Sequence, residues 1–144
     1  MESDKNFENR QFVRHPTEIP IEIWKVDHAE TTNNHEQLNN ISLGGLAFRS
    51  HTNWSNGDAV GIRIPLIDPP FEIIGKVVWC RERQKHYEVG VQFLEKNELF
   101  KVYLVEQICQ IERYRKMVEK QGRNLTAEEA AVEWVKLYGA YFSP

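Results

Sequence analysis

The chain has 144 residues, a hydrophobic content of 41% and a formal net charge of −3 at pH 7. These values predict one globular domain, with at most a small appendage, and argue against a protein that coats nucleic acid. The first fifteen residues are polar, and no apolar run approaches the length of a membrane span. Cys80 and Cys109 form neither a CxxC motif nor a disulfide framework, so we expect a cytoplasmic protein.

Alternating apolar residues predict short β-strands through the first two thirds of the chain. Ile19, Ile21 and Ile23 form the first alternation, and Pro20 suggests an edge position for that strand. A strand over 36–43 is expected to continue through 46–50 after an interruption by two glycines. Further strands are expected at 60–64, 71–81 and 87–93. Strands of this length, separated by turns, are typical of an antiparallel barrel or sandwich.

The apolar period changes to a helical one after Lys96. Phe100, Leu104 and Ile111 follow helical spacing, and Gly122 marks the stop. Thr126 and Glu129 then fit a capping box that begins a second helix. We therefore expect a mainly β fold with an α appendage: residues 1–95 as a β domain with a flexible N-terminal arginine segment, and 96–144 as a helical extension through which the chain could form a homodimer.

The stretch 40–45 (NISLGG) combines polar side chains with bare backbone. On a strand, Asn40 and Ser42 lie on the face opposite Ile41, and Gly44 and Gly45 let another group approach the backbone closely. A flat or anionic ligand could lie on such a surface. Asn, Ser and Gly are also the ordinary residues of a turn, and this alternative stays open.

Two arginines, Arg10 and Arg14, precede the first strand. Residues four apart lie on one side of a helical turn or of an extended chain, while Phe12 could anchor the segment. A guanidinium suits phosphate and the O6/N7 edge of guanine, and its flat face stacks on bases. The pair therefore favours a guanine nucleotide, although two solvated arginines in a polar tail remain the alternative.

Arg10-x-x-x-Arg14 followed by Asn40-x-Ser42-x-x-Gly45 resembles the RxxxR and (D/N)xSxxG signatures of the PilZ domain. The resemblance covers about residues 7–95. It implies a six-stranded antiparallel barrel that binds the bacterial second messenger cyclic di-GMP and signals to a downstream protein partner. The implied ligand-binding residues are Arg10, Arg14, Asn40, Ser42, Gly44, Gly45 and Trp79. Many members carry a further arginine where this chain has Asn9, so we expect one ligand per chain.

No other pattern in the sequence indicates chemistry. The histidines lack the spacing of a zinc site, and no GxSxG elbow surrounds Ser42. We therefore expect no metal, no cofactor and no enzymatic activity, and neither nucleic-acid binding nor membrane insertion. The main alternative function is a PilZ-like adaptor that binds a protein partner but no nucleotide. An oligonucleotide-binding barrel is a third possibility, which the acidic net charge disfavours.

Overall fold

The structure, a computed structural model, describes residues 13–26, 34–65 and 70–138. Arg10 and Phe12, and the expected mobility of the segment around them, lie outside these ranges. The strands are β1 (His15–Pro16), β2 (Pro20–Lys25), β3 (Asn34–Ile41), β4 (Gly45–Ser50), β5 (Ala59–Ile64), β6 (Phe71–Glu82) and β7 (Tyr87–Phe93). Two helices come after the strands, α2 (Glu98–Lys120) and α3 (Ala127–Tyr138).

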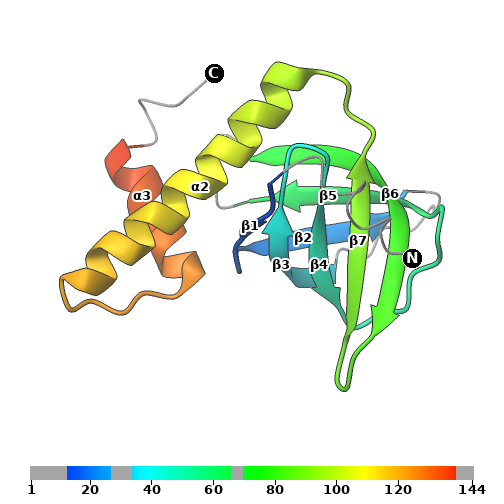
Figure 1. Cartoon of the computed structure of the whole chain (residues 1–144), viewed down its shortest axis with the longest axis horizontal. Helices are drawn as coiled ribbons and strands as arrows, with labels where there is room; N and C mark the ends of the chain where they lie inside the picture. Colours follow the sequence, from blue (N-terminus) through cyan, green and yellow to red (C-terminus); the bar gives the residue numbers. More distant parts are fainter. Residues whose placement is uncertain (1–12, 27–33, 66–69, 139–144) are drawn as a thin grey trace.

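Six of the strands close into an antiparallel barrel. The order around it is β2–β5–β6–β7–β4–β3, and β3 pairs again with β2. The short strand β1 is added to β3 beyond its pairing with β2, with His15 opposite Ile41 and Pro16 opposite Asn40. Figure 1 shows β3, β4, β7 and β6 in this order on the near side of the barrel. The predicted six-stranded barrel is confirmed.

The alternating apolar residues fill the barrel interior. Ile21 and Ile23 of β2, Ile62 of β5 and Phe48 of β4 are each at most 1% exposed. Each fully buried side chain of this size contributes about 1.5–3 kcal/mol through removal of apolar surface from water. Trp54, in the loop after β4, meets Phe48 edge to face with ring centroids 6.2 Å apart. The core thus fixes which side chains remain on the outer face.

The expected edge position of the first strand is wrong, because β2 has partners on both sides. Pro20 is the first residue of β2 and pairs with Gln37 of β3. Pairing with β5 begins only at Glu22, opposite Arg63. A proline, which has no N–H, is tolerated at the first residue of a strand even when the strand is internal.

The glycines after Leu43 reverse the chain instead of interrupting one continuous strand. β3 and β4 form an antiparallel hairpin, in which Ile41 pairs with Leu46. The Ser42 N–H donates to the Gly45 carbonyl at 2.8 Å, and the Ser42 hydroxyl accepts from the Gly44 N–H at 3.3 Å. The side chain of Ser42 therefore stabilises the turn, as short polar residues commonly do.

Both helix signals in the sequence are confirmed. Gly122 ends α2 with a φ of 90°, a left-handed conformation that favours glycine. Thr126 begins α3 with the predicted capping box. Its N–H donates to Glu129 Oε1 at 2.9 Å, and its Oγ1 accepts from the Glu129 N–H at 3.0 Å.

Helix α2 joins the barrel to α3. Its first turns pack on the barrel through Phe71, whose ring centroid lies 5.1 Å from that of Phe100 and 5.4 Å from that of Tyr103. Farther along, Thr17 Oγ1 donates to Glu112 Oε2 at 2.9 Å. Beyond the barrel, α2 packs against α3 (Figure 1), where Trp134 is buried. Within the described residues, no helix is long and apolar enough to cross a bilayer.

Candidate binding surface on the outer face of the barrel

One row of side chains crosses four strands on the outer face of the barrel. Asn40 of β3 pairs with Ala47 of β4, Ala47 pairs with Gly90 of β7, and Gly90 pairs with Trp79 of β6. Paired residues of antiparallel strands project from the same face. Neighbours such as Leu46 and Val91 fill the core, so this row, which we call the platform row, faces away from it. Asn40 and Trp79 are half-buried, whereas Ala47 is 3% exposed and Gly90 is buried beneath the indole of Trp79.

Trp79 reaches the platform row because β6 has a bulge. Val77 pairs with Val91 and Trp79 with Gly90, so Val78 and Trp79 together oppose a single residue of β7. The extra residue exchanges the inward and outward positions in the remainder of β6. Unbroken alternation along β6 would place Trp79 on the inner face with Phe71 and Val77, and the bulge turns it outward instead.

The indole of Trp79 lies directly over Gly90. A Cβ at position 90 would stand 2.1 Å from Trp79 Cε2, so only glycine leaves room for the ring. The guanidinium of Arg81 covers the indole in turn, with Cζ 4.5 Å from the ring centroid. A stacked aromatic and guanidinium form a flat surface on which a base can stack.

A second row, which we call the charged row, runs parallel to the platform row. Gln37 pairs with Arg49, Arg49 with Glu88, and Glu88 with Arg81. Arg83 in the β6–β7 turn donates to Glu88 Oε1 at 2.8 Å. Three arginines thus lie next to one glutamate, and the excess of positive charge in the charged row favours anions.

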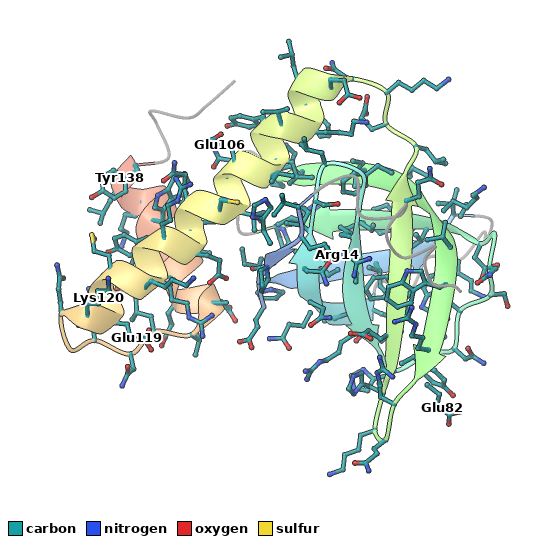
Figure 2. The ribbon with its side chains drawn as sticks, viewed as in Figure 1. Arg14, Glu82, Glu106, Glu119, Lys120 and Tyr138 are labelled. Atoms are coloured by element: carbon teal, nitrogen blue, oxygen red, sulfur yellow. The ribbon has the colours of Figure 1, made fainter. Side chains whose placement is uncertain are left out.

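The polar turn and Arg14 lie at the other end of the platform row. Arg14 is exposed and directly precedes His15, the partner of Ile41, so the register of β1 continues toward Ser42. Figure 2 labels Arg14 over the near side of the barrel. The structure therefore brings Arg14, Asn40 and Ser42 to one edge of the surface, whereas Arg10 lies outside the described residues.

Position 45 requires glycine because β4 and β7 pack closely there. A Cβ there would stand 2.0 Å from the Val91 carbonyl oxygen of β7. On the other side of the turn, the Phe93 N–H donates to the Gly44 carbonyl at 3.0 Å. The close backbone approach expected at these glycines is thus made by β7.

A scan against family models matches residues 8–108 to the PilZ domain. The chain belongs to the PilZ domain family. The resemblance predicted from the two motifs is therefore confirmed, and the match extends into α2. A search of curated proteins finds no match.

Solved PilZ structures share the fold. The PilZ domain of YcgR from Escherichia coli, solved with c-di-GMP, has a TM-score of 0.61 and 18% identity, over 79% of this chain and 98% of that one. The MrkH–c-di-GMP complex of K. pneumonia has a TM-score of 0.53 and 15% identity, over 72% of this chain and 54% of that one. The PilZ domain of CeSA from a cellulose-synthesizing bacterium has a TM-score of 0.50 and 18% identity, over 65% and 94%.

Sequence reasoning missed several residues of this PilZ surface. Ala47, Arg49 and Glu88 belong to no motif. The position of Asn39 on this surface follows only from the register shift between Leu38 and Asn40. One signal was available in β4: Gly45 and Arg49 alternate with the buried Leu46, Phe48 and Ser50, which places them on the outer face, and Ala47, although itself buried, shares their register. Their neighbours across the sheet could not be found this way. Elsewhere, no group of His, Cys, Asp and Glu suited to a metal ion occurs among residues 13–26, 34–65 and 70–138.

Shifted pKa values occur in the helical extension. A hydrogen bond from Arg123, and a second from Tyr114, lower the pKa of Glu133. The hydrogen bond to Glu133, together with burial, raises the pKa of Tyr114. Burial is also the main cause that raises the pKa of Cys109. The Tyr114–Glu133–Arg123 cluster is therefore an electrostatic link between α2 and α3.

Proposed function

We propose that this PilZ domain is a receptor for cyclic di-GMP, which binds on the outer face of β3, β4, β7 and β6. The observation that carries the proposal is the platform row, with a stacking surface at Trp79 and polar groups at Asn40. Neighbouring strands lie about 4.8 Å apart, and Asn40 and Trp79 are three strand spacings apart. The distance between them along the sheet is therefore about 14 Å, and the curvature of the barrel shortens the direct distance. That length suits an extended ligand with two bases.

The residues of this surface have different roles in binding, according to their chemistry. We assign Arg14 the role of meeting a phosphate or the O6/N7 edge of a guanine, and we assign Arg10 the same role from the sequence. Asn40 and Ser42 offer hydrogen bonds beside the hairpin turn. The indole of Trp79 with its stacked Arg81 receives the face of a guanine. Gly44 and Gly45 act indirectly: the Gly44 N–H donates to the Ser42 hydroxyl and holds it in place, and Gly45 lets β4 pack against β7.

The route from the ligand to a protein partner leads through β1 to α2. Thr17 lies three residues after Arg14, is buried, and donates to Glu112 of α2 at 2.9 Å. Glu18 adds an ion pair with Arg115 of the same helix at 3.8 Å. A ligand that fixes Arg14 therefore changes the position of a segment that contacts α2. The helical extension then adopts a conformation that a protein partner recognises.

Titration calorimetry with cyclic di-GMP tests the receptor proposal, with GTP and single-stranded DNA as comparison ligands. We expect one cyclic di-GMP per chain and weak or no binding of the other two. Arg14→Ala removes a charge-assisted contact of about 1.5–3 kcal/mol, which is a loss of about 10- to 100-fold in affinity. Arg113→Ala, which removes an exposed guanidinium from α2, serves as the matched control.

Two results would contradict the proposal. If folded wild-type protein bound no cyclic di-GMP, the adaptor function would be the remaining alternative. Equal affinities of wild type, Arg14→Ala and Arg113→Ala would show that the ligand binds elsewhere on the chain.

A further inference from the structure

Glu88 is an unexpected residue on a surface proposed to bind a ligand with two phosphates. It stands in the charged row between Arg49 and Arg81, and its side chain is 20% exposed. A carboxylate repels phosphates, so an ordinary anion site would not contain one. Its presence calls for a group that a carboxylate attracts.

The carboxylate of Glu88 is held in place by two contacts. Oε1 accepts from Arg83 at 2.8 Å, and Oε2 accepts from Asn39 Nδ2 at 2.7 Å. Asn39 reaches it from the register shift in β3, across strand β4. An ionised carboxylate has about four acceptor sites. Each oxygen therefore keeps capacity for one more donor, in an orientation that the two contacts fix.

Glu88 also lies at the right distance from the stacking surface. It is two residues from Gly90 along β7, so the two positions are about 6.6 Å apart on the same face. A purine that stacks over Trp79 and Arg81 can direct one edge toward Glu88. Arg49 and Arg81 flank Glu88 in the charged row and add positive charge beside the base.

We infer that Glu88 is a specificity residue that accepts hydrogen bonds from the Watson–Crick edge of one guanine; the inference rests on the proposed function. Guanine presents two donors there, N1–H and the N2 amino group. Adenine presents an acceptor, N1, between C2–H and its N6 amino group. A fixed carboxylate accepts from the guanine edge and repels adenine N1, since it has no proton to donate. Glu88 thereby selects cyclic di-GMP over cyclic di-AMP.

Glu88→Gln tests this role, because glutamine keeps the shape and can both donate and accept. Affinities for cyclic di-GMP and cyclic di-AMP are measured for each protein, and their ratio is compared. The ratio is insensitive to the general gain in positive charge, which affects both dianions alike. Glu82→Gln is the matched control: it removes the same charge from an exposed residue at the end of β6 (Figure 2).

We expect wild type and Glu82→Gln to prefer cyclic di-GMP by about 100-fold or more, and Glu88→Gln to lower that preference at least about tenfold. Cyclic di-IMP, which lacks the N2 amino group, tests the same contact in the unaltered protein and should bind about tenfold more weakly than cyclic di-GMP.

An unchanged ratio in Glu88→Gln, or equal binding of cyclic di-IMP and cyclic di-GMP, would overturn the role of Glu88 while cyclic di-GMP binding stands. Wild-type protein that binds no cyclic dinucleotide would overturn the receptor proposal, and this inference with it.

Discussion

Gly45→Ala should destabilise the barrel by about 1–3.5 kcal/mol net. The added Cβ would stand 2.0 Å from the Val91 carbonyl oxygen, so β4 and β7 must separate by about 1 Å at this point. Overpacking of a well-packed site costs about 1–3 kcal/mol, and a weakened ladder hydrogen bond costs about 1 kcal/mol more. Restriction of the unfolded chain by alanine offsets this by about 0.4–1 kcal/mol. The net loss is a large share of the 5–15 kcal/mol typical of a domain.

Equilibrium unfolding in urea measures this loss, and Gly90→Ala is the informative comparison. There the new Cβ meets the indole of Trp79 at 2.1 Å, which is a side chain that can rotate away. We expect Gly90→Ala to lose less stability than Gly45→Ala but to displace the stacking surface and weaken cyclic di-GMP binding. An unfolding midpoint of Gly45→Ala equal to that of wild type would refute the strand-packing explanation of this glycine.

Three further predictions concern the helices and their link to the barrel. Thr126→Ala should destabilise α3 by about 1 kcal/mol, seen as faster amide hydrogen exchange in its first turn; unchanged exchange would mean that the capping box contributes nothing. Because folding lowers the pKa of Glu133, its ionised form adds to the free energy of unfolding above the unfolded-state pKa, and this stabilisation is lost as the pH falls through the folded-state pKa. Glu133→Gln should therefore be less stable than wild type at neutral pH and lose less stability on acidification, whereas the same acid dependence in both proteins would contradict this. Thr17→Ala should leave cyclic di-GMP affinity nearly unchanged but reduce ligand-induced protection of α2 in hydrogen exchange, whereas full protection would exclude the Thr17–Glu112 route.

Local patterns predicted most of the elements of this fold. The strands near 60–64, 71–81 and 87–93 follow from alternation alone, because one face of each strand is buried. The capping box at Thr126 and the stop at Gly122 depend on residues within one or two turns of the helix ends. Signals of this kind are contained in the local sequence.

The candidate surface could be predicted only in part, since it depends on the pairing of distant strands. Trp79 continues the apolar alternation of Phe71, Ile73 and Val77, and only its pairing with Gly90 reveals the bulge that turns it outward. Ala47 and Glu88 have no local signal of a role, and they join the surface through the register of β4 and β7. The motif residues Asn40 and Ser42 mark one edge of a surface whose remainder is set by tertiary structure.

The central claim is that cyclic di-GMP binds across the platform row, and amide chemical-shift mapping tests it most directly. The barrel contains an internal control, because Trp24 of β2 lies over Gly61 of β5 just as Trp79 lies over Gly90, on strands outside the proposed surface. We predict that cyclic di-GMP shifts the amides of Asn40 and Gly90 and the indole N–H of Trp79, and leaves those of Gly61 and Trp24 unchanged. Shifts centred on Trp24 and Gly61, with the Gly90 and Trp79 signals unmoved, would contradict the account.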